Sequence, residues 1–350
     1  MTASEDFTSL TGQFRRELLA HCYRMLGSAD EAEDLVQETY LRAWRAYQGF
    51  EGRSSVRTWL YRIATNACLT AIERRGRRPL PSGLGGPGED PGAPVLAAPE
   101  VPWLQPIPDA LLASPHDDPA QAAAARAGTR LAMVAALQYL SARQRAMLIL
   151  RDVLDWPAAE VAAMLDTTTT AVNSGLRRAR AQLARALPDE DDVAEPAEPE
   201  YRALLDRFAL AFENGDVTEL TALLRQDVAL EMPPMLTWFA GRENVRRFLA
   251  TKLFGTPGQF RLVPTRANGQ PAFAAYEREH DGVYRAHAAL VLTVTATGIA
   301  RIVIFLSPGL LGAFGLPHEY RAGGRTSAPD PAATPRPSTA PDLAVPTWPR

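Results

Sequence analysis

The sequence predicts a multidomain chain in which two all-α domains are followed by an α+β domain. Apolar residues recur at helical spacing in residues 7–78 and again in 121–187, and each stretch therefore predicts a bundle of helices. Proline- and glycine-rich residues 79–119 separate the two bundles, and acidic residues 188–199 precede the α+β domain at 200–320. With 350 residues and 46% hydrophobic content, the chain is long enough for two or three separate cores.

The first bundle begins with apolar residues at helical spacing from Phe7 to Leu26, and its next helix has two chemically different faces. One face is apolar, and the other carries Asp30, Asp34 and Glu38. After a break at residues 49–52, a further helix turns Val56, Trp59, Leu60, Ile63, Ala67 and Ala71 inward. Its other face presents Arg57, Tyr61, Arg62, Thr65 and Asn66. Rings, guanidinium groups and an amide suit nucleic acid opened into single strands, which leaves the acidic helix for another partner.

Charged residues on an amphipathic helix often do no more than face solvent, and each of these residues taken singly fits that interpretation. Residues 30–40, with Phe50, residues 59–64 and Asn66, nevertheless resemble the core domain of bacterial sigma factors, within the extracytoplasmic-function group of the sigma-70 family. The resemblance implies that core RNA polymerase is bound through Asp30, Asp34, Gln37 and Glu38. It also implies that the melted minus 10 element of promoter DNA is captured by Phe50, Arg53, Ser54, Ser55, Trp59, Tyr61, Asn66, Arg74 and Arg75.

Charge and cysteine content narrow the class of protein. A formal net charge of -3 does not suit a protein that coats DNA by itself, although arginines cluster at residues 74–78 and 177–185. Cys22 and Cys68 lack the spacing of a zinc site or a disulfide framework, so we expect buried reduced thiols, no metal and no cofactor. The chain has no signal-like start and no apolar run of membrane-spanning length, which predicts a cytoplasmic protein without a membrane partner.

The linker at 79–119 contains a short apolar segment that needs a partner. Trp103, Leu104 and Ile107, with Pro106 between them, would expose apolar area in a proline-rich stretch unless they dock on something. We expect them to dock on a neighbouring domain, and our hypothesis is that Trp103 docks on the third domain. Chance composition is the alternative.

The second bundle contains a helix-turn-helix pattern. Trp156 and Pro157 open a short helix, residues 166–167 form a turn, and a second helix runs from about Thr169 to Leu187. In this second helix Val172, Leu176, Ala179 and Leu183 face inward, which leaves Thr170, Asn173, Ser174, Arg177, Arg178 and Arg180 for base edges and phosphates. A plain helical bundle with an arginine face is the alternative.

Residues 138–187 also resemble the sigma domain that reads the minus 35 element of promoter DNA. The chain departs from that pattern at Asn173 and Gly175, which stand where relatives commonly carry basic residues. We therefore expect altered base readout and lower affinity for phosphate.

The third domain begins with helices and continues with strands at about residues 259–263, 271–277, 285–295 and 298–306, which predicts a curved antiparallel sheet in an α+β cone. This order resembles the SnoaL-like, polyketide-cyclase and ketosteroid-isomerase type of domain, and sigma factors that carry it also tend to have a Trp-Leu-x-Pro segment, here at 103–106. The resemblance implies a regulatory domain, with an unknown small molecule as a candidate ligand. Residues 321–350 predict a disordered tail.

An enzymatic cone is the competing hypothesis, because such a domain can hold a general base in an apolar pocket. The candidates are Asp227, His280, Asp281 and His287, and no signature joins them, so we predict that the protein is not an enzyme. We therefore expect a sigma factor that binds core RNA polymerase and promoter DNA. The alternative is a stand-alone helix-turn-helix regulator fused to a ligand-binding or cyclase-like domain.

Overall fold

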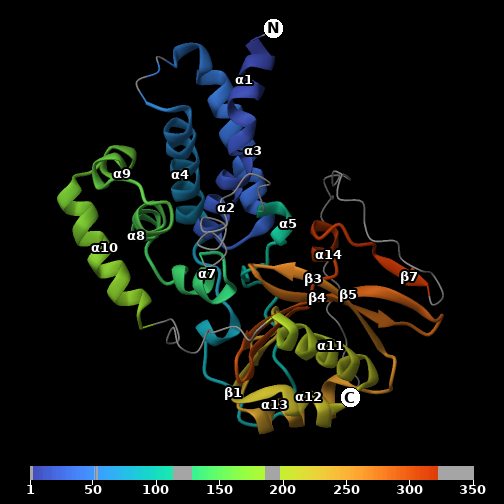
Figure 1. Cartoon of the computed structure of the whole chain (residues 1–350). Coiled ribbons are helices and arrows are strands. Elements are labelled where there is room, and N and C mark those ends of the chain that lie inside the picture. Colours follow the sequence, from blue (N-terminus) through green and yellow to red (C-terminus); the bar gives the residue numbers. More distant parts are fainter. Residues whose placement is uncertain (1–2, 51, 53, 113–127, 186–197, 322–350) are drawn as a thin grey trace. The chain divides into compact units, whose positions relative to one another are not determined.

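The computed structural model describes residues 3–50, 52, 54–112, 128–185 and 198–321 (Figure 1). The chain divides into two compact units. The helical unit comprises Met1–Pro79 and Pro102–Pro188, and the cone unit comprises Leu80–Val101 and Asp189–Arg350. The linker thus belongs partly to each unit, although its sequence predicts a segment without a core of its own. The expected acidic hinge and the expected tail lie almost wholly outside the described residues.

The first half of the helical unit contains α1 (Ala3–Thr11), η1 (Gly12–Phe14), α2 (Arg15–Leu26), α3 (Ala29–Ala46), η2 (Tyr47–Gly49) and α4 (Val56–Arg75). The apolar pattern from Phe7 to Leu26 therefore spans two helices joined by a 3-10 turn. Gly27 ends α2 in the left-handed conformation, with φ of 70°, and the Ser28 hydroxyl accepts a hydrogen bond from the Glu31 amide to begin α3. Two short signals thereby set the angle between α2 and α3.

The second half of this unit contains α5 (Asp109–Leu112), α7 (Leu131–Leu137), α8 (Ala142–Leu148), a π-helical turn η4 (Ile149–Val153), α9 (Ala158–Met164) and α10 (Thr169–Leu183). Ser141 and Gln144 form a capping box at the start of α8. Helices α9 and α10 confirm the helix-turn-helix pattern, with Asp166 in the turn at φ of 49°. Val172, Leu176 and Ala179 are buried as expected.

Gly175 requires a correction. It is buried in α10, and a Cβ atom there would come within 2.5 Å of the Met147 sulfur in α8. The position faces the core, so its lack of a basic side chain removes no DNA contact. Close packing of α8 on α10 therefore suits a residue without a side chain at this position.

Arg145 of α8 ties the two halves of the helical unit together. It is 1% exposed, and its guanidinium donates to the carbonyls of Gln138 and Leu140, just beyond the end of α7. It also donates to the carbonyl of Met25, in the last turn of α2. Helix C-termini carry partial negative charge, so these carbonyls stabilise the buried cation. Burial still lowers the pKa of Arg145 to about 10.

The cone unit begins with α11 (Glu198–Asn214) and α12 (Val217–Leu223), and α13 (Arg242–Phe248) with the π-helical turn η6 (Leu249–Leu253) follows later. Its strands are β1 (Leu224–Glu231), β2 (Phe239–Ala240), β3 (Phe260–Ala267), β4 (Gln270–Arg278), β5 (Val283–Thr295), β6 (Gly298–Phe305) and β7 (Glu319–Arg321), with α14 (Leu310–Ala313) before the last. Helices α11, α12 and α13 lie along one side of the sheet (Figure 1). This arrangement confirms the α+β cone.

The sheet order is β2-β1-β6-β5-β4-β3, and β7 pairs with β5. The expectation of a purely antiparallel sheet is wrong for one pair, because β1 and β6 run parallel. Strand β6, the last long strand of the chain, therefore lies in the middle of the sheet, next to β1, the first strand. The core between sheet and helices is built from aromatic and aliphatic side chains such as Phe208, Phe239, Phe248 and Leu290.

Candidate promoter and polymerase interfaces

The acidic face of α3 lies on the surface. Asp30, Asp34 and Gln37 are exposed and Glu38 is half-buried. The three acids are spaced four residues apart, so they share one side of the helix. Glu38 forms an ion pair with Arg42 at 2.6 Å, and Asp30 accepts a hydrogen bond from the Gln105 amide of the linker at 3.3 Å. The face therefore presents a row of carboxylates to solvent.

The N-terminal half of α4 combines aromatic and polar groups. The Ser55 hydroxyl accepts from the Thr58 amide at 3.0 Å and so begins the helix. Phe50 lies 4.7 Å from Trp59 between ring centroids, and both rings are half-buried. Asn66, two turns beyond Trp59, is exposed. Ser54, Arg62, Arg74 and Arg75 are exposed as well. Arg53, which belongs to the expected minus 10 site, lies outside the described residues.

Tyr61 does not lie on this surface, so its expected role in DNA binding is corrected. The ring is 0% exposed, and its hydroxyl donates to the Glu17 carboxylate at 3.2 Å. Burial raises the pKa of Tyr61. Thr65, placed on the same face by its spacing, is also buried, and its hydroxyl contacts the Met164 sulfur of α9 at 3.7 Å. A second helical layer covers part of the α4 face that the sequence pattern assigned to nucleic acid.

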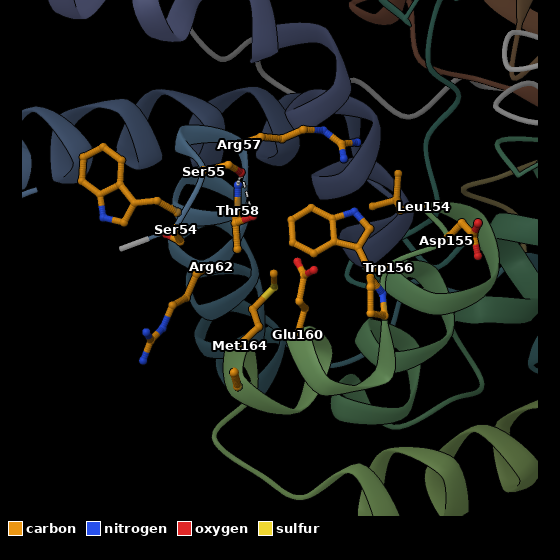
Figure 2. A pocket seen from close by; sticks show the side chains of 13 residues that line it. Ser54, Ser55, Arg57, Thr58, Arg62, Leu154, Asp155, Trp156, Glu160 and Met164 are labelled. Atoms are coloured by element: carbon orange, nitrogen blue, oxygen red, sulfur yellow. Dashed lines mark hydrogen bonds between the residues drawn. The ribbon is translucent and has the colours of Figure 1, made fainter. Parts of the chain in front are cut away.

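That layer comes from α9 and the turn before it. Trp156 is 4% exposed, lies 5.1 Å from the Tyr61 ring, and packs beneath the Arg57 guanidinium at 5.3 Å. Arg57 in turn pairs with Glu17 at 2.8 Å. A cavity of about 710 Å³ opens beside this contact (Figure 2). Its walls are Ser54, Ser55, Arg57, Thr58, Trp59 and Arg62 on one side and Leu154, Asp155, Trp156, Pro157, Glu160, Ala163 and Met164 on the other.

The outer side of α10 is open by comparison. Thr168 caps the helix, and Thr170, Asn173, Arg177 and Arg178 are exposed, with Ser174 half-buried. Arg180 is also exposed, but its guanidinium is held by the Asp152 carboxylate at 2.6 Å and 2.9 Å. That carboxylate raises the pKa of Arg180. The six residues assigned to DNA thus share one surface, and one of them already has an anionic partner.

The Trp103 segment belongs to the helical unit, where the Trp103 carbonyl accepts a hydrogen bond from Arg78 at 3.1 Å, and docking of Trp103 on the cone stays a prediction. Leu104 and Ile107 are 0% exposed, and Pro106 is also buried. The backbone amide of Gln105 donates to the Gly27 carbonyl at 2.9 Å. Its side-chain oxygen accepts from the Ser28 hydroxyl at 2.6 Å. This segment therefore contacts the turn between α2 and α3 in the first bundle.

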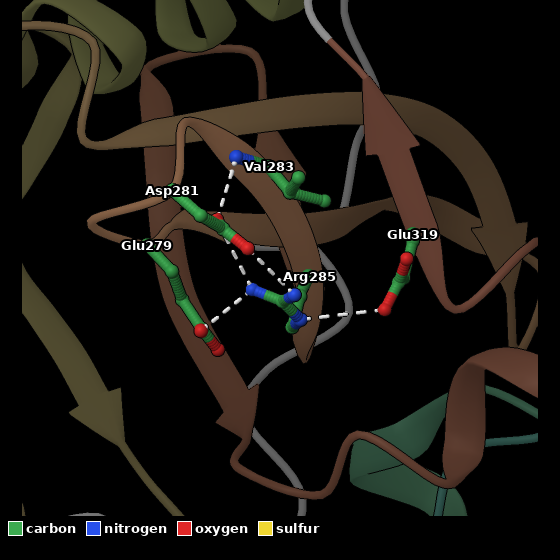
Figure 3. Close-up of polar contacts among 5 residues, drawn as sticks. All are labelled: Glu279, Asp281, Val283, Arg285 and Glu319. Carbon is green, nitrogen blue, oxygen red and sulfur yellow. Dashed lines mark hydrogen bonds and ion pairs between the residues drawn. The ribbon is translucent and has the colours of Figure 1, made fainter.

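The four candidate bases of the cone do not form a site. The pKa of Asp281 falls to about 2, because it pairs with Arg285, which also contacts Glu279 and Glu319 (Figure 3). Such a carboxyl is a weak base at neutral pH. Asp227 pairs with Arg225 at 2.8 Å, and His287 with Glu277 at 3.1 Å. An apolar cavity in the core has a volume of only about 10 Å³ and is lined by none of these residues.

Cys22 and Cys68 are free in the structure, and both are buried as expected. A hydrogen bond with Cys22 and burial raise the pKa of Cys68. Among the described residues, no group of three or more His, Cys, Asp and Glu side chains could hold a metal ion. None of the helices described here is long and apolar enough to cross a membrane.

Comparison with known proteins identifies the family to which the helical unit belongs. The sigma-70 region 2 family model matches residues 10–78, and the sigma-70 region 4 model matches residues 130–183. The ECF RNA polymerase sigma factor SigG of Mycobacterium tuberculosis is 49% identical over 314 residues, which cover 89% of this chain and 84% of that protein. SigJ of the same organism is 29% identical over 302 residues, covering 80% of this chain and 85% of SigJ.

A solved structure supports the fold across both units. The crystal structure of SigJ matches with a TM-score of 0.53 at 23% identity and covers 89% of this chain and 98% of that one. The family models and the identity with SigG cover the residues that form α2–α4 and α7–α10. The chain therefore belongs to the extracytoplasmic-function (ECF) sigma factors of RNA polymerase.

Proposed function

We propose how this sigma factor divides its task among its surfaces. Sigma factors bind core RNA polymerase and direct it to promoters through regions 2 and 4. We assign polymerase docking to the acidic face of α3, where Asp34 and Glu38 lie on one exposed row. A row of like charges steers a basic partner and sets its register, so this face suits a positively charged surface of the enzyme.

Capture of the minus 10 strand is assigned to the exposed side of α4. The observation that carries this assignment is the close contact of the tilted Phe50 and Trp59 rings, with Asn66 exposed further along the helix that holds Trp59. An aromatic platform stacks an unpaired base, and an amide can hydrogen-bond its edge. Arg62, Arg74 and Arg75 supply positive charge for phosphates along the helix.

Reading of the minus 35 element is assigned to α10. Thr170, Asn173 and Ser174 lie in the first half of the helix, which in a helix-turn-helix enters the major groove. Arg177 and Arg178 follow on exposed positions and suit phosphate contacts. Because Arg180 is paired with Asp152, we expect it to contribute less than Arg178.

The cone is assigned a regulatory role and no catalytic one. Three of its four candidate bases, Asp227, Asp281 and His287, are held in ion pairs, and the apolar cavity of about 10 Å³ in its core is too small for an organic substrate. As a partner of RNA polymerase, the protein is proposed to act in the cytoplasm. We place the control of promoter recognition in contacts of the cone with its own chain.

The variant Asn66→Ala tests the minus 10 assignment. It should reduce promoter opening about 5- to 100-fold, because loss of contacts to an unstacked base costs about 1–3 kcal/mol. Permanganate footprinting of holoenzyme on a cognate promoter measures the bubble, and core polymerase binding is measured beside it. Thr70→Ala, one turn further on an exposed position, is the matched control. An unchanged bubble for Asn66→Ala would place base capture elsewhere.

A further inference from the structure

The first half of the linker, Leu80–Val101, packs on the cone and is called the strap below. Its residues 96–98 run beside residues 234–236 like an added strand. Leu236 donates to the Leu96 carbonyl at 2.7 Å, Ala98 donates to the Pro234 carbonyl at 2.9 Å, and Ala97 pairs with Met235 in an antiparallel bridge. Such backbone pairing is how extended peptides commonly bind the edge of a folded domain.

Side chains of the cone hold the rest of the strap. The Trp238 indole donates to the Gly85 carbonyl at 2.9 Å, and the Thr237 hydroxyl accepts from the Leu96 amide at 3.0 Å. Gly88 donates to the Trp238 carbonyl at 2.7 Å and passes so close to Phe239 that a Cβ atom would lie 3.1 Å from its ring. The close approach of the strap to the cone thus favours a residue without a side chain at this point.

The strap also completes a buried charge. Glu231, at the end of β1, is 0% exposed, and one carboxylate oxygen pairs with Arg301 of β6. The other oxygen accepts a hydrogen bond from the Ser82 amide of the strap at 2.9 Å. A buried carboxylate is costly unless both oxygens have donors. The cone therefore relies on the strap to satisfy an acid in its own interior.

We propose that the β1–β2 end of the cone is a binding site for an extended proline- and glycine-rich peptide, and that its ligand is the strap of this same chain. The cone then remains attached to the linker even when its covalent connection beyond Pro188 is cut. This inference rests on the proposed regulatory role and specifies its route. The cone acts on regions 2 and 4 by occupying the segment that joins them.

The physical consequence is a competition for the linker. While bound, the strap keeps its backbone hydrogen bonds on the cone, so the linker between regions 2 and 4 is effectively shortened. Release frees those residues to extend and lets the two regions move apart. Because the strap is tethered beside its site, a weak contact is sufficient to keep it bound, and a modest change in the cone shifts the balance.

A cleavage experiment on the full chain tests the proposal. A specific protease site is inserted between Pro188 and Glu198, the folded protein is cut, and dissociation of the cone is followed by gel filtration at decreasing concentrations. We expect the cone to co-elute with the remainder. The double variant Trp238→Phe with Thr237→Val removes two hydrogen bonds to the strap and should raise the apparent Kd at least about tenfold.

The variant Thr265→Val serves as the matched control, because it makes the same change on β3, at the opposite end of the sheet order. Immediate loss of the cone from the cut wild-type protein would overturn the proposal. Equal retention by the double variant would also overturn it, because another surface would then hold the cone. The proposal is supported if the cut cone stays bound in the wild-type protein and in Thr265→Val but dissociates more readily in the double variant.

Transcription by the same proteins separates this inference from the proposed function. If the double variant releases the cone but leaves promoter-dependent transcription unchanged, the strap site stands and the regulatory role of the cone falls. Suppose instead that deletion of the cone changes transcription, but the strap variants keep the cone fully bound after cleavage. The regulatory role then stands and the strap site falls.

Discussion

Helices α4 and α10 both carry residues assigned to promoter DNA, and they differ in how open those residues are. The outer side of α10 faces solvent, whereas α4 is packed on its other side by Trp156 and Met164 of region 4. The cavity beside Trp59 is therefore walled by region 4 as well as by region 2. In this conformation the residues of α10 assigned to DNA are mostly exposed, and those of α4 are exposed only on the side away from region 4.

We infer from this difference that access to α4 depends on the packing between the two regions. Arg145 and Trp156 hold region 4 on region 2 through helix-end carbonyls and an aromatic contact. Neither contact involves an exposed residue of α4 or α10, because Tyr61, the partner of Trp156, is buried. Separation of the regions would widen access to α4 and leave α10 unchanged, so the two DNA-binding activities should respond differently to the same substitution.

The largest effect is expected for Trp156→Ala. Truncation of a buried tryptophan removes packing worth about 3–5 kcal/mol, and loosening of region 4 should raise binding of a single-stranded minus 10 oligonucleotide about tenfold. Fluorescence anisotropy on the full chain measures that affinity. Thr65→Val, which removes only the hydroxyl that contacts Met164 and His21, should give a smaller change in the same direction. Lower affinity in both variants, with the fold intact by circular dichroism, would contradict the shielding of α4.

A smaller effect is expected when the pH is lowered, because acid should destabilise the protein through a buried histidine packed against α4. His21 is fully buried beside Thr65, and burial, with Arg24 nearby, lowers its pKa from 6.5 to about 3. Its folded-state pKa lies below the unfolded value, so stability is fully present above pH 6.5 and is lost as the pH falls toward 3. Between pH 7 and 5 we expect a loss of about 2 kcal/mol from this group.

Urea unfolding at the two pH values measures this loss, and His21→Leu should remove most of the difference. A pH dependence that is the same in His21→Leu and wild type would assign it to other groups. Minus 35 binding is the matched readout, because α10 contains no histidine and should retain its affinity over this range.

The smallest effect compares two arginines on α10. Arg178→Ala should weaken binding to every duplex several-fold and reduce the salt slope by about 1, because one phosphate contact is lost. Arg180→Ala should change binding less, since Asp152 already pairs with that guanidinium. Filter binding across a salt series measures both variants. An equal loss for the two would mean that Asp152 releases Arg180 when DNA binds.

Much of the site was predictable from local pattern. The 3.6-residue spacing placed Asp30, Asp34 and Glu38 on one face, and the turn chemistry at Asp166 marked the start of the recognition helix. Tyr61 and Thr65 could not be placed in this way. Their spacing matches the exposed face of α4, and only the arrival of α9 from about a hundred residues further along buries them. Periodicity reports which residues share a side, not what covers it.

The sequence by itself determined the domain types, the helix-turn-helix and the need of Trp103 and Leu104 for a partner, because these follow from short-range spacing, capping and apolar area. Only the tertiary structure decided which surface receives each half of the linker. Gln105 meets Gly27, and Ser82 meets Glu231, across long stretches of chain. Such pairings depend on where distant backbone donors and acceptors come together in the fold, and no local pattern of residues encodes that position.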